Sequence, residues 1–143
     1  MQQSNSSRTH VTYLLRQHHL RLTPQRLAIA EFILNQKMHI TARKVHEHMR
    51  HDFPSMSLNT IYLTLKQFET CGFIHSFEID GNIIFDSNTT PHNHAYCHQC
   101  NSLIDLKNSD QFTLPPQLTQ WDIQSEQRIW LGLCPACIKQ THT

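Results

Sequence analysis

The sequence contains no apolar run that approaches the ~18 residues needed for a membrane-spanning helix. Its first ten residues, MQQSNSSRTH, are polar and have no apolar core of the kind found in secretory signals. We therefore expect a cytoplasmic protein in a reducing compartment. The five cysteines are then better candidates for metal ligands than for disulfides.

A large excess of charge of either sign is also missing, because 12 Lys and Arg stand against 11 Asp and Glu. Net charge alone therefore gives no argument for nucleic acid binding. The distribution is uneven, however. Residues 1–71 have nine basic and four acidic side chains, a local charge of +5, whereas residues 86–143 have three and five, a local charge of −2. This asymmetry indicates a front half that could approach phosphate, although many solvated helices are equally basic.

Four helices are predicted in the front half, over residues 8–20, 24–36, 41–50 and 57–71. Three of them begin at a residue whose side-chain oxygen can cap the first turn, namely Thr23 (followed by Pro24), Thr41 and Ser57. Gly72 ends the fourth helix. Beyond it, residues 73–80 and 82–86 are rich in β-forming side chains and meet at Asp80-Gly81, which predicts a hairpin.

The predicted fold class is α+β. Helices followed by a hairpin are typical of an N-terminal winged helix-turn-helix domain, here residues 1–86, whose fourth helix would enter the major groove. An ordinary small α+β domain is the alternative. Residues 87–143 are expected to form a small C-terminal α/β dimerisation domain with structural zinc. We expect strands near 94–106 and 127–134, one short helix from Pro115 or Pro116, and a helical tail. Dimerisation would supply the burial that so few apolar residues cannot.

Two CxxC pairs, separated by 33 residues, predict a structural Zn²⁺ site. The four thiolates of Cys97, Cys100, Cys134 and Cys137 would complete a tetrahedral shell and leave no open position for a substrate. A redox CxxC would be a single motif at the start of a helix, and a zinc deaminase would need a His-x-Glu motif, so both fit poorly. Cys71 belongs to neither pair and is expected to be a small buried residue without chemistry.

A second candidate metal site centres on His92-x-His94. Residues two apart in an extended segment point the same way, so both imidazoles could meet one ion. Asp86 and Asp105 lie nearby in the sequence, and such mixed nitrogen and oxygen donors suit Fe²⁺, Mn²⁺ or Zn²⁺. An accidental HxH in a polar loop is the alternative. His46-Glu47-His48 falls in a predicted helix and is interpreted as a solvated face.

In their order and spacing, several motifs resemble the ferric uptake regulator family over about residues 10–138. The motifs are Leu22-Thr23-Pro24-Gln25-Arg26, His39-Ile40-Thr41-Ala42, Ser57 with Thr60-Ile61-Tyr62, His92-x-His94 and the paired CxxC. The resemblance implies a winged-helix domain that binds double-stranded operator DNA, a dimerisation domain, a homodimer and metal-dependent repression. It implies a regulator rather than an enzyme.

The chain looks most like the peroxide-responsive branch of that family, PerR. The resemblance implies a regulatory site for Fe²⁺ or Mn²⁺ made of His39, Asp86, His92, His94 and Asp105. Two Asp rather than Glu favour this branch over the iron-sensing one, and a zinc-sensing member would usually have a cysteine near position 86. With Fe²⁺ bound, peroxide would oxidise a ligating imidazole, here His39 or His92, and the protein would release DNA.

The resemblance also assigns DNA contacts to Tyr62 and Thr60 on the fourth helix, and phosphate contacts to Lys66, Arg16 and Arg26. The sequence departs from the family at Leu63, where relatives often have Arg or Asn. It departs again at Asn101, which replaces a usual Gly, and in the segment LPPQL of the dimerisation domain.

Three alternatives to the peroxide sensor stay open at this point. An iron or manganese uptake regulator would use the same ligands without an oxidative switch. A zinc-only DNA-binding module would have a vestigial second site. A metalloenzyme would use the His and Asp residues for catalysis, but the sequence offers no additional general acid or base and no nucleophile motif.

Overall fold

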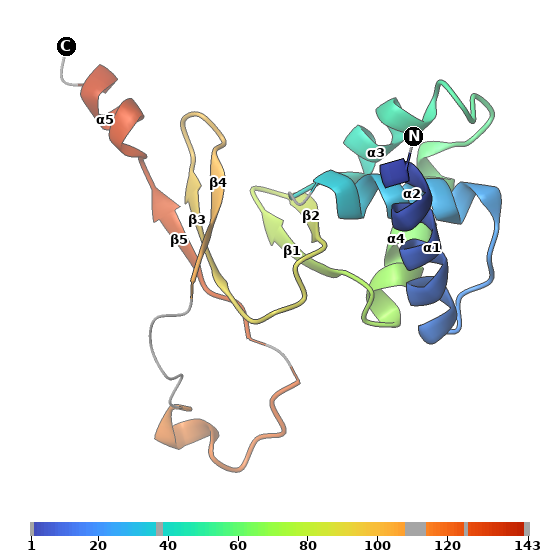
Figure 1. Cartoon of the computed structure of the whole chain (residues 1–143). Helices are drawn as coiled ribbons and strands as arrows, with labels where there is room; N and C mark the ends of the chain where they lie inside the picture. The colour runs from blue at the N-terminus through green and yellow to red at the C-terminus, as the bar shows by residue number, and fades with distance from the viewer. Residues whose placement is uncertain (1, 37–38, 108–113, 125, 142–143) are drawn as a thin grey trace. The chain divides into compact units, whose positions relative to one another are not determined.

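A computed structural model describes residues 2–36, 39–107, 114–124 and 126–141. The chain divides into two compact units, Met1–Thr89 and Thr90–Thr143, each described here by itself (Figure 1). Among the described residues, no helix is both long enough and apolar enough to cross a membrane.

Four helices form most of the first unit: α1 (Gln2–Gln17), α2 (Pro24–Gln36), α3 (Ala42–Met49) and α4 (Leu58–Thr70). All three predicted N-caps are confirmed. The hydroxyl oxygens of Thr23, Thr41 and Ser57 accept backbone N–H bonds from Arg26, Lys44 and Thr60 at 3.2, 3.3 and 3.1 Å. Each cap satisfies a donor that the first turn leaves free, so these starts are fixed locally.

The predicted bounds of α1 were wrong, and those of α3 and α4 differ from the observed bounds by one residue at each end. α1 begins at Gln2 instead of residue 8 and ends at Gln17 instead of residue 20. It ends early because His19 adopts a left-handed backbone with φ of 55°, which the right-handed helix cannot accommodate. α3 ends at Met49, and Arg50 is its C-cap.

The wing of the first unit is an antiparallel hairpin of β1 (His75–Ile79) and β2 (Asn82–Asp86). Its turn is the predicted Asp80-Gly81, and both residues have positive φ, 50° and 73°, as a tight two-residue hairpin turn requires. β1 begins two residues later than predicted, because Phe73 and Ile74 are buried in the helical core.

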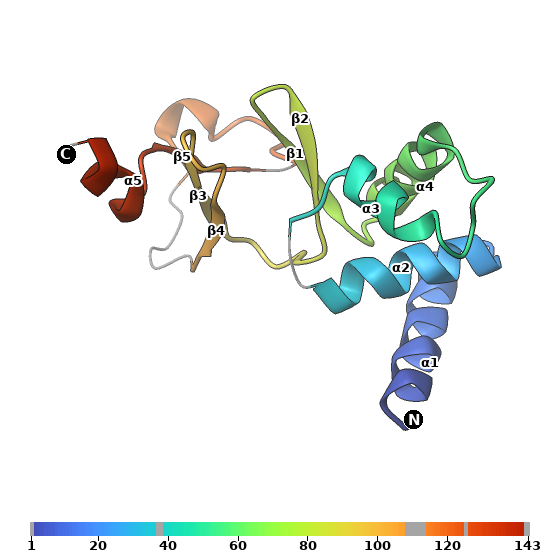
Figure 2. The same ribbon diagram turned by 90° about the horizontal axis from the view of Figure 1, so that it is seen from above.

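Helices α2, α3 and α4 and the hairpin of the first unit lie close together in the chain's ribbon (Figure 2). One continuous apolar core holds the helices and the wing together. Leu15 of α1, Ile29 and Ile33 of α2, Phe68 of α4 and Phe85 of β2 are almost fully buried in it. The first unit therefore has the burial of an ordinary small domain.

The second unit contains β3 (Asn93–Cys97), β4 (Leu103–Leu106), the 3₁₀ turn η1 (Pro116–Leu118), β5 (Ile129–Gly132) and α5 (Pro135–Thr141). Its sheet has the order β4-β3-β5, with β3 antiparallel to β4 and parallel to β5. The single strand predicted over residues 94–106 is thus two strands joined by a cysteine-containing turn. The short helix at Pro116 and the helical tail are confirmed.

Burial in the second unit is sparse. Among its described residues, the buried side chains are His94, Cys97 and Cys137. Trp130 and Leu131 of β5 remain 60% and 68% exposed, although neighbouring strand residues point to opposite faces of the sheet. The described part of this unit therefore has no apolar core of the ordinary kind, and its buried side chains are all candidate metal ligands.

Candidate metal centres and nucleic-acid interface

The four paired cysteines come together in the second unit. Cys97 ends β3, Cys100 lies in the following turn, Cys134 follows β5, and Cys137 is in the first turn of α5. Their sulfur atoms lie within 4.8 Å of one another, and the Cys100 and Cys134 Sγ atoms are 3.8 Å apart. Two sulfurs bound at ~2.3 Å to one tetrahedral Zn²⁺ are separated by about 3.8 Å. The donor set and its spacing both fit that ion.

Local hydrogen bonds favour the thiolate form at one of these positions. Backbone N–H groups of Cys100 and Cys134 lower the pKa of the Cys97 thiol to about 6, and the Cys134 N–H lies 3.2 Å from its sulfur. By contrast, hydrogen bonding to Cys134, together with burial, raises the pKa of the Cys137 thiol to about 12. Four thiols this close cannot all ionise unless a cation compensates them, and Zn²⁺ supplies that charge.

The second unit also brings together His92, His94 and Asp105. His94 on β3 and Asp105 on β4 are direct partners in the antiparallel register. The Asp105 Oδ1 atom lies 3.6 Å from the Nε2 atoms of both His92 and His94. This is long for a hydrogen bond, but two ligands bound at ~2.1 Å to one ion are about 3.0–3.6 Å apart.

A backbone carbonyl sets the orientation of the His92 ring. Nδ1 of His92 donates to the Thr90 carbonyl oxygen at 2.6 Å, and because a carbonyl only accepts, Nδ1 must carry the proton. In the neutral ring, Nε2 then keeps its lone pair and faces Asp105. Metal-binding histidines commonly have such an outer partner, which makes the other nitrogen a better ligand.

The first unit holds His39 and Asp86 as a second pair. Their neighbours Ile40 and Phe85 exchange two backbone hydrogen bonds of 2.9 and 2.8 Å, which fasten the residues before α3 to β2. The His39 Nε2 and Asp86 Oδ2 atoms consequently lie 3.6 Å apart, again a spacing suited to two ligands of one ion. The other Asp86 oxygen, Oδ1, accepts the Asn88 N–H at 2.8 Å and so holds the carboxylate in place.

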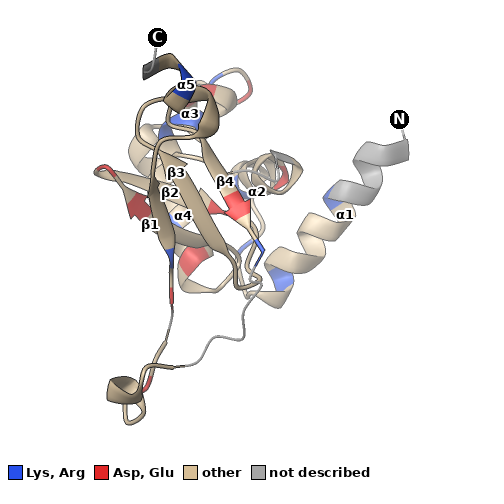
Figure 3. Ribbon diagram, turned by 90° about the vertical axis from the view of Figure 1, so that its left-hand side faces the viewer, with Lys and Arg blue, Asp and Glu red and all other residues tan. Residues whose placement is uncertain are grey.

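The predicted DNA-contacting residues have different environments. Thr60 is exposed on α4, and Arg16 is exposed on α1, where basic side chains occur without an acidic one among residues 8–17 (Figure 3). Tyr62 is half-buried, with its ring edge against Phe85. The Lys66 Nζ atom contacts Glu69 Oε2 at 2.5 Å. Leu63, which departs from the family, is 53% exposed on the same helix.

Two features escaped prediction from the sequence. Arg26 binds the Arg21 carbonyl at 3.2 Å and the Gln67 side chain, a contact that no local pattern reveals. His46 is half-buried, and its Nε2 is 2.9 Å from the Met56 carbonyl oxygen, so the interpretation of residues 46–48 as a solvated face was wrong for His46. Cys71 is in the first unit, whereas the four paired cysteines are in the second. It is half-buried, and its thiol donates to the Phe68 carbonyl at 3.2 Å.

Comparison with known proteins agrees with this architecture. The sequence model that describes the ferric uptake regulator family matches residues 17–126 of this chain. The peroxide-responsive repressor PerR of Staphylococcus aureus is 32% identical over 127 residues, which cover 86% of this chain and 86% of that protein. A solved structure on peroxide sensing and gene regulation by PerR from Streptococcus pyogenes aligns with a TM-score of 0.51, at 25% identity and 92% coverage of both chains.

A zinc uptake regulator complexed with zinc and DNA has the same fold, with a TM-score of 0.66, 18% identity and 97% coverage of both chains. The family match covers most of the sequence, and the family consists of transcriptional regulators rather than enzymes, which removes the metalloenzyme alternative. This chain therefore belongs to the ferric uptake regulator family of metal-dependent repressors.

Proposed function

We propose that the protein is a peroxide-sensing repressor that binds operator DNA as a homodimer while a regulatory metal ion is bound. Residues 1–86 act as the DNA-binding domain, with α4 in the major groove, and residues 87–143 provide dimerisation and metal binding. The likeness to the Staphylococcus aureus PerR supports the peroxide signal. The exposed Trp130 and Leu131 support a partner subunit over β5.

The four cysteines hold a structural Zn²⁺. A tetrahedral shell filled by protein sulfur has no position for a substrate, so this ion stabilises the fold and takes no part in sensing. Its importance follows from the sparse burial of the second unit, where Cys97 and Cys137 are two of three buried side chains among the described residues. Metal binding there contributes directly to the free energy of folding.

One observation carries the sensing mechanism: each unit presents an incomplete set of ligands. His39 and Asp86 belong to the first unit, and His92, His94 and Asp105 belong to the second. An Fe²⁺ or Mn²⁺ ion that takes all five ligands fixes the angle between the units. In a homodimer it thereby sets the distance between the two α4 helices, so that metal binding and DNA binding strengthen each other.

Peroxide would act through the imidazoles. Bound Fe²⁺ supplies the reducing power for a reaction with hydrogen peroxide, which Mn²⁺ does not. His39 and His92 are the candidate ligands whose rings would react. Either imidazole would gain one oxygen atom from hydrogen peroxide, and the other oxygen atom of the peroxide would leave as water. An oxidised ring is a poor ligand, so the link between the two units is lost and DNA is released.

The test compares DNA release by the Fe²⁺ and Mn²⁺ forms in dilute hydrogen peroxide, with peptide mass analysis in parallel. We expect release from the Fe²⁺ form alone, together with the mass of one added oxygen atom on a peptide that contains His39 or His92. If both forms keep DNA, the protein is an iron or manganese uptake regulator without an oxidative switch.

Substitution of one ligand from each unit tests the shared site. We expect His39→Ala and Asp105→Ala each to abolish metal-dependent DNA binding while zinc content stays unchanged. Metal-dependent binding that survives both substitutions would show that the second site is vestigial.

A further inference from the structure

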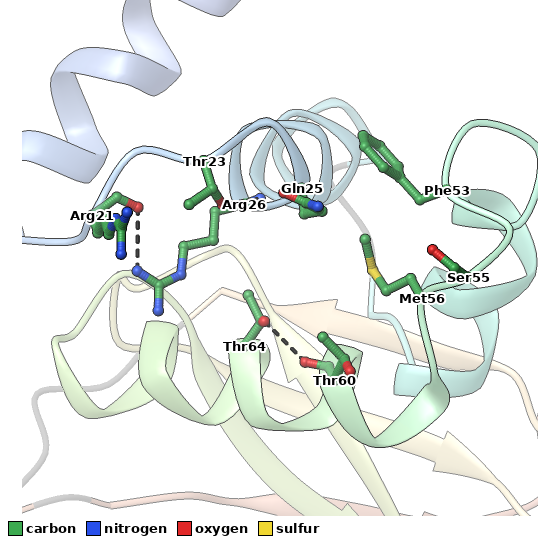
Figure 4. A pocket seen from close by; sticks show the side chains of 9 residues that line it. All are labelled: Arg21, Thr23, Gln25, Arg26, Phe53, Ser55, Met56, Thr60 and Thr64. Carbon is green, nitrogen blue, oxygen red and sulfur yellow. Dashed lines mark hydrogen bonds between the residues drawn. The ribbon is translucent and has the colours of Figure 1, made fainter.

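A pocket of about 450 Å³ lies in the first unit, between the start of α2, residues 53–56 and the outer side of α4 (Figure 4). Its charged lining residues are Arg21 and Arg26, and none of its lining side chains is acidic. Hydroxyl groups contribute most of the remaining polar lining: Thr23, Ser55, Thr60 and Thr64, of which the Thr64 hydroxyl already donates to the Thr60 carbonyl at 2.9 Å. A site with two guanidinium groups and several hydroxyls suits an anion with several acceptor oxygens, such as a phosphate.

The Arg26 side chain is held in place at this pocket. Its Nη1 atom donates to the Arg21 carbonyl at 3.2 Å, and its Nη2 atom donates to the Gln67 side-chain oxygen (Figure 4 draws the first bond). A guanidinium group has five N–H donors, so these two bonds leave further donors for a ligand. Because the Gln67 amide is uncharged, it orients Arg26 without cancelling its positive charge.

Gln67, which accepts the hydrogen bond from Arg26, lies on the exposed face of α4. Thr60, Leu63 and Gln67 are exposed and follow one another at intervals of three and four residues, so they form one outward stripe of the helix. Thr60 lines the pocket at the first end of this stripe, and Gln67 holds Arg26 further along. An anion in the pocket would therefore lie beside the helix surface that faces a bound duplex.

We propose that this pocket receives one phosphate of the DNA backbone and that Gln67 is a positioning residue that directs the Arg26 guanidinium toward it. The inference rests on the proposed DNA-binding function, for which a phosphate contact of Arg26 is already expected, and adds to it the pocket that receives the phosphate and the role of Gln67. The site contributes affinity and orientation, and the base edges are contacted by other side chains of α4, such as Tyr62.

The experiment measures affinity for operator DNA, selected from a random duplex library with the Mn²⁺-loaded protein, between about 50 and 200 mM salt. We expect Arg26→Ala to weaken binding roughly tenfold and to reduce the slope of log affinity against log salt by about one for each pocket filled. Gln67→Met keeps the length of the side chain and removes the acceptor, so it should give a smaller loss in the same direction. Gln120→Met, at an exposed position of the second unit, is the matched control and should change neither quantity.

A double-mutant comparison separates positioning from a merely structural role. In the Arg26→Ala background, Gln67→Met should have no further effect, because Gln67 acts through Arg26. An undiminished effect in that background, or an unchanged salt slope in Arg26→Ala, would overturn the proposal while leaving the proposed function intact. Failure of the wild-type protein to bind DNA with any metal would instead refute the proposed function as well.

Titration with inorganic phosphate tests a free anion as the occupant. We expect no binding at millimolar phosphate by calorimetry. Phosphate binding that Arg26→Ala abolishes, with an unchanged DNA salt slope, would assign the pocket to a small anion and overturn the proposal.

Discussion

Asn101 accepts a hydrogen bond from the Tyr96 hydroxyl at 2.8 Å and has a left-handed backbone with φ of 58°. Its N–H donates to the Cys97 carbonyl at 2.8 Å, which closes the turn that contains Cys97 and Cys100. Asparagine tolerates this conformation better than other non-glycine residues. The departure from the family's usual Gly therefore preserves the turn and adds a side-chain contact to β3.

The turn at Asn101 should tolerate glycine but not alanine. Alanine adopts the left-handed conformation at position 101 less readily than asparagine does. We therefore expect Asn101→Ala to destabilise the zinc-bound protein by about 1 kcal/mol. Asn101→Gly should cost less, because it loses only the exposed hydrogen bond to Tyr96. Thermal unfolding measures both, and Tyr96→Phe isolates the hydrogen bond. Equal losses for Ala and Gly would contradict this account.

Asp86 should be a metal ligand rather than a structural residue. Asp86→Asn keeps a side-chain oxygen for the Asn88 N–H and removes the carboxylate charge beside His39. We expect Mn²⁺ affinity to fall at least roughly tenfold with an unchanged unfolding temperature. Asp80→Asn, in the exposed hairpin turn, is the control. Equal Mn²⁺ affinity in the two variants would exclude Asp86 from the site.

The ion pair between Lys66 and Glu69 should stabilise the first unit only over a limited pH range. Burial favours a higher pKa for the Glu69 carboxyl, but hydrogen bonds from Lys66 and Ser76 hold its pKa below the ordinary value. The hydrogen bond to Glu69 raises the pKa of Lys66. Stabilisation by the carboxylate is thus complete above its unfolded pKa of about 4.3 and is lost as pH falls through the lower folded pKa.

Glu69→Gln should therefore destabilise the protein by up to about 1 kcal/mol at pH 7 and by less in acid. The raised Lys66 pKa has the opposite sign: its contribution is complete below about pH 10.4 and disappears as pH rises through the folded value. Urea unfolding of the variant and the wild type at a series of pH values measures the free energy of unfolding. The difference between the two proteins shows the acid and alkaline limits of the stabilisation. A difference that does not change between neutral and acid pH would count against the pair.

Exposed apolar residues of β5 should mediate dimerisation. Leu131→Asp places a charge on a strand whose Trp130 and Leu131 side chains are exposed, so we expect the dimer dissociation constant to rise at least roughly tenfold. Sedimentation equilibrium measures it, with zinc content as the check on folding. Tyr13→Asp, at a 58% exposed position of α1, is the matched control. A Leu131→Asp protein that remains dimeric would place the interface elsewhere.

Features that depend on neighbouring residues could be predicted from the sequence. Thr41 and Ser57 cap their helices, and Asp80-Gly81 turns the hairpin, because each effect is contained within about four residues. The spacing of Cys97 and Cys100 likewise indicates a shared ion, because two thiolates separated by two residues can reach one ion from a single tight turn.

Contacts between distant segments could not be predicted in this way. No local pattern reveals that Ile40 pairs with Phe85, although this pairing brings His39 close to Asp86. The contact between Arg26 and Gln67, 41 residues apart, also depends on how the helices pack.

The sparse burial of the second unit has a consequence for how the protein matures after synthesis. The buried side chains of this unit, among the described residues, are His94, Cys97 and Cys137. So little burial cannot drive the unit to fold before it binds a metal ion. The first unit, with its own apolar interior, can fold as soon as it leaves the ribosome. In a cell with too little zinc, the protein would then accumulate with its first unit folded and its second unit unfolded. The amount of functional regulator would therefore depend on zinc before iron or peroxide had any influence.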